Sequence, residues 1–218
     1  MLKAVFFDLD GTLLDTVGDI RAYVNDMLRA FSYPEITEVQ ARAYVGDGAR
    51  KLIESSVPKN VANAANVDEC YRYFSERFAA SENSRTTLFE GEMEVLSALK
   101  ARGVKLAVIT NKPHDATIGS LKKFFPEGTF DYIGGDSGMF ACKPDPSHTR
   151  FAALTMRVAP RECVFVGDGE TDVRTAKNAG MRCISVLWGY RTREQLEKAG
   201  AGEFVTSFAE LGKILENA

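Results

Sequence analysis

The sequence predicts an α/β protein with a three-layer core, in which a parallel, Rossmann-like sheet lies between helices and an all-α cap domain is inserted. Three observations favour this fold. Short apolar runs alternate with helical patterns, the runs are rich in Val, Ile and Phe, and one long segment near the N-terminus holds only helical patterns. Such runs suit strands that are buried on both faces, and strand–helix alternation is typical of a parallel sheet.

Six runs are the expected strands, four of them pronounced and two fainter. The pronounced runs are AVFF (4–7), VKLAVI (104–109), CVFV (163–166) and CISVLW (183–188), and the fainter ones are DYI (131–133) and EFVT (203–206). A helix over 92–102 is expected to stop at Gly103, and another over 171–179 at Gly180. Glycine is a common residue at such helix ends because it adopts the left-handed conformation readily.

Residues 16–85 interrupt the alternation and predict the cap. Thr16, followed three residues later by Asp19, is typical of a capping box, and apolar residues then recur at helical spacing as far as Phe31. Further helical patterns cover 37–45, 48–57 and 67–80. We therefore expect residues 1–15 and 86–218 to form the core and residues 16–85 to form the cap. The aromatic residues expected inside the cap are Tyr71, Tyr73, Phe74 and Phe78.

Composition and charge argue against several classes of protein. The chain has 218 residues, of which 45% are hydrophobic and 26% charged, as in ordinary globular proteins. A net charge of -3 without a basic run argues against nucleic-acid binding. No apolar stretch reaches the ~18 residues of a membrane helix, and the first apolar run starts too early for a signal peptide. The four cysteines form no C-x-x-C pair, so we expect a cytoplasmic protein without a zinc or redox site.

Polar side chains cluster where the expected strands end. In an open parallel sheet, ligands bind beyond the carboxyl ends of the strands. The clusters are Asp8 with Asp10, Thr110 with Asn111 and Lys112, Asp168 with Glu170 and Asp172, and Lys143 in ACKPDP. If the strands are neighbours, these residues share one site. For Asp172, as for Asp15, a helix N-cap or a solvated turn is the alternative interpretation.

The spacing of Asp8 and Asp10 predicts a cation site. Two ionised carboxylates this close repel each other unless a cation intervenes, and Asp168 offers a third carboxylate. Oxygen ligands of this kind suit Mg²⁺, whereas the two histidines are too few and too far apart for zinc. A calcium loop of the EF-hand type starting at Asp8 would need glycine and glutamate where the chain has Leu13 and Asp19.

Taken in order, the motifs DLDGTLLDT, ITNK, CKPDP and VGDGETD resemble the four motifs of the haloacid dehalogenase superfamily of aspartate-nucleophile phosphatases. The resemblance covers most of 1–15 and 86–188, and the helical insert lies where that family carries its cap. VGDG (45–48), the stretch from FEG to ITNKP, and VLWGY (186–190) are similar to the phosphoglycolate phosphatase branch. The resemblance implies a Mg²⁺-dependent phosphatase that acts on a small phosphorylated metabolite, as a monomer or a homodimer.

The same resemblance implies two catalytic aspartates. Asp8 would attack the substrate phosphorus and form an aspartyl phosphate. Asp10 would protonate the leaving alcohol and then activate water, and the dehalogenases of the superfamily lack this second aspartate. The metal ligands would be Asp8, the backbone carbonyl of Asp10, and Asp168. Asp172 would support the site either as a ligand through a water molecule or as a hydrogen-bond acceptor behind the ligands.

Phosphate binding is implied for a second group of residues. Thr110 would hold a phosphoryl oxygen and Lys143 would stabilise the phosphoryl charge and the nucleophile, while Asn111 and Gly11 would complete the phosphate site. Arg50, at the start of a cap helix behind Gly46–Gly48, would meet a carboxylate of the substrate. The alternative for Arg50 is an exposed arginine after a tight turn.

Other polar and aromatic residues have less specific interpretations. We expect Lys112 to be a charge at the rim of the site and His114 to be a surface residue at a helix start. Trp188 and Tyr190 are expected to pack beside the end of the sheet.

Three alternatives to a phosphatase stay open. A phosphomutase or a pyrophosphatase would use the same core. A receiver-like phosphoacceptor also places an aspartate cluster and a lysine on a parallel sheet, but the helical insert of about 70 residues and the D-x-D spacing argue against it. A binding protein with an inactive site would lack at least one catalytic side chain, and all of the expected ones are present.

Overall fold

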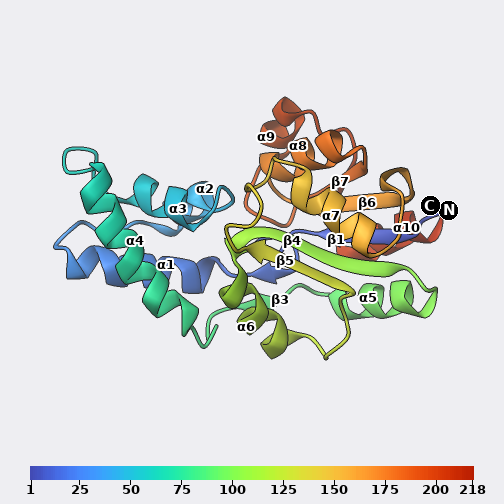
Figure 1. Ribbon diagram of the computed structural model, residues 1–218, viewed down its shortest axis with the longest axis horizontal. Helices are drawn as coiled ribbons and strands as arrows, with labels where there is room; N and C mark the ends of the chain where they lie inside the picture. Colours follow the sequence, from blue (N-terminus) through green and yellow to red (C-terminus); the bar gives the residue numbers. More distant parts are fainter.

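Six parallel strands form the central sheet of the protein, for which the computed structural model describes residues 1–218 (Figure 1). The strands are β1 (Ala4–Phe7), β4 (Lys105–Pro113), β5 (Tyr132–Asp136), β6 (Cys163–Gly167), β7 (Arg182–Val186) and β8 (Phe204–Val205). Their order in the sheet is β5-β4-β1-β6-β7-β8, so β1 lies between β4 and β6. All six expected strands are present, and the predicted fold class is confirmed.

Helices cover both faces of this sheet and complete the three layers (Figure 1). Alternate residues of β1 point to opposite faces, as a strand requires. The core helices are α5 (Glu92–Ala101), α6 (His114–Phe124), α7 (Ser147–Thr155), α8 (Glu170–Ala179), α9 (Arg193–Ala199) and α10 (Phe208–Glu216), with a 3-10 turn at Pro160–Glu162. Val5 and Phe7 pack with α5, α6 and α10, whereas Ala4 and Phe6 pack with α7 and α8.

Strand β4 is longer than the apolar run VKLAVI predicts. It continues through Thr110, Asn111 and Lys112 to Pro113 because β5 still pairs with it there, at Pro113 and Asp136. Backbone hydrogen bonds to a neighbouring strand do not depend on apolar side chains, so the polar end of the strand has no hydrophobic signature. These polar residues are therefore held on a strand at the carboxyl edge of the sheet.

Four helices form a second hydrophobic core, separate from the two beside the sheet. They are α1 (Val17–Ala30), α2 (Glu38–Tyr44), α3 (Ala49–Ser56) and α4 (Ala64–Ala79). Phe74 and Phe78 are buried in this core and Tyr71 and Tyr73 pack against it, as the sequence predicts. The segments that connect it to the sheet pair as β2 (Leu14–Asp15) and β3 (Thr87–Leu88). The domain bounds 16–85 stay a prediction, which this arrangement supports.

The capping box predicted at Thr16 is wrong. Thr16 precedes α1 but its side chain caps no backbone amide; its hydroxyl lies 3.2 Å from the hydroxyl of Tyr190. Asp19 instead accepts hydrogen bonds from the backbone N–H of Arg85 (3.0 Å) and from the hydroxyl of Thr86 (2.6 Å). Partners that are distant in the sequence have replaced the local ones. Asp19 thereby joins the start of α1 to the segment that leads from the cap back to the core.

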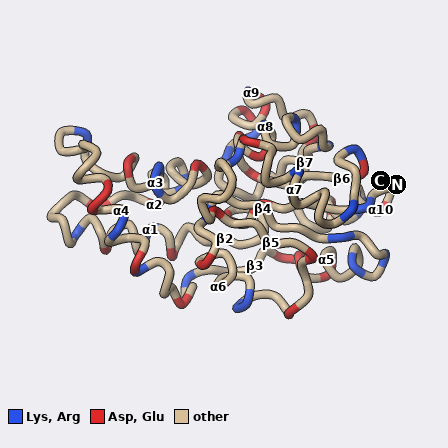
Figure 2. Tube along the Cα trace, viewed as in Figure 1, with Lys and Arg blue, Asp and Glu red and all other residues tan.

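Charged residues of both signs are spread over the cap and the core (Figure 2). None of the helices combines the length and the apolar character that crossing a membrane would require.

Glu92, the first residue of α5, is a buried carboxyl group without a partner. Its exposed fraction is 1%, and neither of its carboxyl oxygens has a hydrogen-bond partner. Burial raises its pKa from 4.5 to about 9. The folded protein therefore keeps a proton on Glu92 that the unfolded chain releases above pH 4.5, so this group makes the free energy of unfolding fall as pH rises from 4.5 to 9.

Replacing Glu92 by glutamine is expected to stabilise the protein at pH 8 by up to about 5 kcal/mol. It should have little effect near pH 3, where the carboxyl is protonated in both states. Urea unfolding at the two pH values measures the difference. Glu94→Gln, on the exposed side of the same helical turn, is the matched control and should show no such pH dependence. An equal effect of Glu92→Gln at both pH values would contradict the interpretation.

Candidate active site

The strand order brings the polar clusters of the sequence to one edge of the sheet. β1 ends at Phe7 and is followed directly by Asp8; its neighbours are β4, which carries Thr110, and β6, which is followed by Asp168. The carboxyl ends of neighbouring parallel strands lie side by side. The three segments therefore meet around Asp8, although more than 150 residues separate Asp8 from Asp168.

Three buried carboxylates and one lysine form the centre of the site. Asp8, Asp168 and Asp172 each offer an oxygen, and these oxygens all lie within 4.8 Å of one another. The ammonium of Lys143 lies 2.9 Å from Asp8 and 2.6 Å from Asp172. All four side chains are buried. The structure therefore brings together four of the residues that the sequence predicts.

The charges of this cluster are not balanced. Burial, and then the Asp172 carboxylate, raise the pKa of Asp8 to about 7 in spite of Lys143. Burial and Asp172 also raise the pKa of Asp168, to about 6. Burial by itself would lower the pKa of Lys143, but Asp172 and Asp8 outweigh it and raise that pKa above its usual value. One ammonium thus faces three carboxylates, which leaves excess negative charge in a buried place.

The cluster fits a divalent cation such as Mg²⁺. Its donors are all carboxylate oxygens, which hard cations prefer, and its unbalanced negative charge is what a divalent cation would neutralise. The side chain of Asp10 lies outside this cluster, so Asp10 would contribute only its backbone carbonyl. The residues present therefore suit the metal that the sequence predicts.

Asp168 is held in place by short contacts from two other segments. The hydroxyl of Thr12 donates to one carboxylate oxygen (3.0 Å) and the backbone N–H of Tyr190 donates to the other (2.8 Å). Gly11 has a φ of +86°, and a Cβ there would lie 2.5 Å from the Asp168 carboxylate. Gly11 lines neither cavity next to Asp8, so its place in the fold is explained by this close approach to Asp168.

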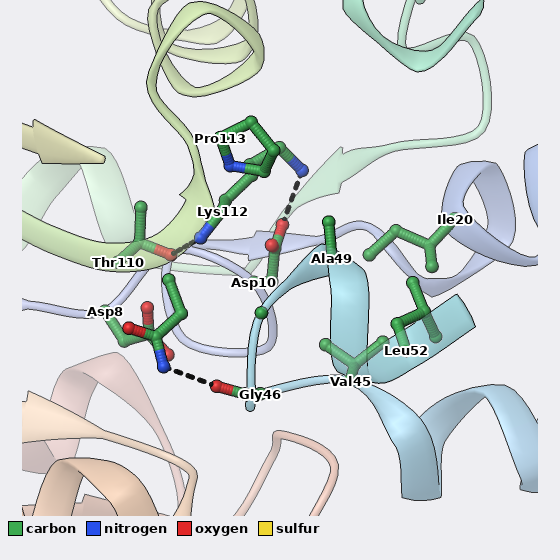
Figure 3. Close-up of a pocket in the computed structure, with 12 residues that line it drawn as sticks. Asp8, Asp10, Ile20, Val45, Gly46, Ala49, Leu52, Thr110, Lys112 and Pro113 are labelled. Carbon is green, nitrogen blue, oxygen red and sulfur yellow. Dashed lines mark hydrogen bonds and ion pairs between the residues drawn. The ribbon is translucent and has the colours of Figure 1, made fainter. Parts of the chain in front are cut away.

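The sequence predicts a rim charge at Lys112, but in the structure Lys112 is buried and pairs with Asp10. Its ammonium lies 2.8 Å from the Asp10 carboxylate, and the exposed fractions of the two side chains are 2% and 12% (Figure 3). The ammonium also lies 4.8 Å from the centre of the Phe78 ring on α4. Because β4 lies beside β1 and the cap covers the edge of the sheet, a side chain that follows the apolar run of β4 is enclosed.

Thr110 and Asn111 lie where the sequence predicts, in the wall of the pocket next to Asp8. Figure 3 shows Thr110 there. Asn111 also connects three segments: its amide donates to the backbone carbonyls of Gly46 (2.9 Å) and Lys143 (3.1 Å). Its carbonyl oxygen accepts from the backbone N–H of Lys143 at 2.7 Å. Asn111 therefore positions the segment that carries Lys143 and contacts the cap.

The pocket has a floor of sheet residues and a roof of cap residues. Its volume is about 40 Å³. The floor is formed by Asp8, Asp10, Thr110, Asn111, Lys112 and Pro113, and the roof by Ile20, Val45, Gly46, Gly48, Ala49 and Leu52. Arg50 does not line it: its side chain is 56% exposed and pairs with Asp68 on α4. Arg50 follows Ala49 on α3 but lies outside this pocket, so its role as a carboxylate receiver stays a prediction.

Two residues of the core, Tyr190 and Arg191, make contacts with the cap that the sequence does not predict. The hydroxyl of Tyr190 accepts from the backbone N–H groups of Thr16 and Val17, at 2.9 and 3.1 Å, where α1 begins. Arg191 pairs with Glu170 and donates to the backbone carbonyl of Val45, in the roof, at 2.6 Å. The sequence shows that polar residues follow strand β7. It does not show that their hydrogen-bond partners lie in the cap, more than 100 residues earlier in the chain.

The sequence matches the family of haloacid dehalogenase-like hydrolases over residues 5–186. It is 34% identical over 192 residues to phosphoglycolate phosphatase 1 of Pseudomonas aeruginosa, covering 86% of this chain and 70% of the relative. It is 30% identical over 220 residues to the phosphoglycolate phosphatase of Vibrio parahaemolyticus, covering 98% and 96%.

Solved structures with the same fold cover nearly the whole chain. A predicted phosphoglycolate phosphatase from Haemophilus somnus superposes with a TM-score of 0.90 at 26% identity and covers 98% of both chains. CbbY from Rhodobacter sphaeroides, in complex with phosphate, superposes with a TM-score of 0.75 at 27% identity and covers 97% of both. The chain therefore belongs to the haloacid dehalogenase-like hydrolase family, in which it is similar to phosphoglycolate phosphatases.

Proposed function

We propose that this protein is a Mg²⁺-dependent phosphatase that hydrolyses a small, phosphoglycolate-like phosphate monoester through an aspartyl phosphate on Asp8. The observation that carries the proposal is that Asp8 takes part in two arrangements at once. It belongs to the buried cluster with Lys143, Asp168 and Asp172, and it lines the pocket together with Asp10. Free cysteines at all four positions agree with a cytoplasmic protein.

The first half of the proposed reaction is attack by Asp8. Phosphate monoester hydrolysis needs up to ~10²¹-fold acceleration, mostly from positioning and from positive charge around the phosphoryl group. Lys143, 2.9 Å from the attacking carboxylate, supplies one such charge, and the hydroxyl of Thr110 can donate to a phosphoryl oxygen. A Mg²⁺ ion held by Asp8, Asp168 and the carbonyl of Asp10 would neutralise the phosphoryl charge further.

Asp10 serves both halves of the proposed reaction. As an acid it gives its proton to the leaving oxygen, and as a base it takes a proton from the water that attacks the aspartyl phosphate. Asp10 lines the pocket and its carboxylate does not belong to the acidic cluster, so a leaving group and later a water molecule in the pocket can reach it. The two aspartates thus separate nucleophilic attack from proton transfer.

The pocket supports a small substrate. One water molecule needs about 10–15 Å³ of this kind of volume, so the 40 Å³ beneath the cap suits a leaving group of few non-hydrogen atoms. The relatives from Pseudomonas and Vibrio are named phosphoglycolate phosphatases, and the leaving alcohol of phosphoglycolate has only two carbons. The small pocket and these names together support a phosphoglycolate-like substrate.

A substrate panel with and without metal tests the proposal. With Mg²⁺ present we expect 2-phosphoglycolate to give a higher kcat/KM than pyrophosphate or sugar phosphates, and EDTA to lower turnover by about 10³-fold or more. Adding Mg²⁺ back should restore the rate, which excludes unfolding as the cause of the loss. Undiminished turnover after metal removal would contradict the metal assignment. Release of sugar-phosphate isomers without free phosphate would identify a phosphomutase instead.

A further inference from the structure

We propose that Lys112 recognises the leaving group of the substrate. Its ammonium binds a carboxylate one methylene away from the ester oxygen, so that the enzyme selects phosphate esters of 2-hydroxy acids. This inference rests on the proposed phosphatase function and adds a specificity residue to it. The sequence predicts only a rim charge for Lys112, and it leaves Arg50 open between a carboxylate receiver and an exposed arginine.

Lys112 is the only cationic side chain that lines the pocket. The pocket's other ionisable side chains are Asp8 and Asp10, both acidic. Their carboxylate forms would repel a substrate with a second negative charge if no cation compensated. Arg50, the other candidate, is exposed and paired with Asp68, so it offers no compensation.

The short distance between Lys112 and Asp10 places the ammonium within reach of such a substrate carboxylate. Asp10 has to reach the ester oxygen in order to protonate it, and hydrogen-bond contact is the condition for that step. The Lys112 ammonium lies 2.8 Å from the same Asp10 carboxylate (Figure 3). A carboxylate one methylene beyond the ester oxygen is therefore within reach of Lys112, whereas a charge at the far end of a longer leaving group is not.

The ammonium of Lys112 has hydrogen-bonding capacity left. It carries three N–H groups, and the structure shows one hydrogen bond from it, to Asp10. The ring of Phe78 covers the ammonium at 4.8 Å but takes no conventional hydrogen bond. Because the side chain is 2% exposed, bulk water does not readily supply the missing acceptors. A buried ammonium with unused donors facing a pocket is suited to an anionic ligand.

The cap strengthens the same preference. Gly48 and Ala49, at the start of α3, line the roof of the pocket, and no side chain caps the first turn of this helix. The backbone amides at a helix start favour negative charge nearby. The anionic end of the leaving group would thus lie between Lys112 below and the start of α3 above.

The test compares a charged with a neutral leaving group. We expect Lys112→Met to lower the ratio of kcat/KM for 2-phosphoglycolate to kcat/KM for ethyl phosphate by about 100-fold, mainly through KM, because ethyl phosphate has the same carbon count but no carboxylate. Lys51→Met, on the exposed surface of α3, is the matched control and should keep the wild-type ratio. An equal loss on both substrates would mean that Lys112 only positions Asp10, and no loss on either would mean that it has no role. Either result overturns the proposal.

The wild-type protein provides a second test that does not depend on a variant. We expect it to prefer 2-phosphoglycolate over the neutral amide, 2-phosphoglycolamide, by about 100-fold in kcat/KM. Equal rates on the two substrates would overturn the proposal that the enzyme recognises the carboxylate, while leaving the phosphatase assignment intact. Failure of the wild-type protein to hydrolyse any of these esters would instead overturn the proposed function itself.

Discussion

Asp8→Asn is expected to lower kcat for 2-phosphoglycolate by about 10⁴-fold or more, because the amide is a poor nucleophile and removes the group that accepts the phosphoryl. The fold should persist. Asp8 is buried with a pKa raised to about 7, so a neutral side chain of the same shape relieves repulsion from Asp172. Steady-state release of inorganic phosphate measures the loss, and thermal unfolding at pH 7.5 measures the integrity of the variant.

A matched substitution separates this effect from a general loss of charge. Asp68→Asn, on the exposed surface of the cap, should leave kcat within about twofold, since surface substitutions have small effects. Acid quenching of the wild-type protein during turnover of ³²P-labelled substrate should trap label on the chain, and Asp8→Asn should trap none. Substantial hydrolysis by a folded Asp8→Asn protein would remove Asp8 from the role of nucleophile.

Asp10→Asn is expected to trap the reaction halfway. With p-nitrophenyl phosphate, whose leaving group needs no acid, the variant should release about one equivalent of nitrophenolate per site in a burst and then turn over about 10²- to 10⁴-fold more slowly than wild type. The reason is that the second half needs a base for water, which asparagine does not provide. Stopped-flow absorbance measures the burst, and rapid quench measures the phosphoenzyme that accumulates.

Asp15→Asn is the control for this variant. Asp15 lies in the same motif and accepts a hydrogen bond from the hydroxyl of Tyr190, which the carbonyl oxygen of asparagine can also accept. It should turn over at the wild-type rate without a burst. If Asp10→Asn lost the fast and the slow phase equally and no phosphoenzyme accumulated, the acid and base role would belong to another group.

Much of the fold followed from local patterns. A strand buried on both faces needs an uninterrupted apolar run, and AVFF and CVFV are such runs, so β1 and β6 were predicted at nearly their observed bounds. The candidate residues Asp8, Lys143 and Asp168 were also accessible, because their residue types and order resemble a known family. Apolar runs do not specify which strands are neighbours, and the position of β1 between β4 and β6 is a property of the folded sheet.

The sequence by itself determined the strands, the helical insert and the residue types of the site, since these depend on burial patterns along the chain and on short motifs. The partner of each charged side chain was decided only by the tertiary structure. Lys112 pairs with Asp10, and Arg50 pairs with Asp68. Asp19 takes no part in a capping box and accepts a hydrogen bond from Thr86 instead. Hydrogen bonds and ion pairs act over a few ångströms in space, and the sequence does not record which distant segments come that close.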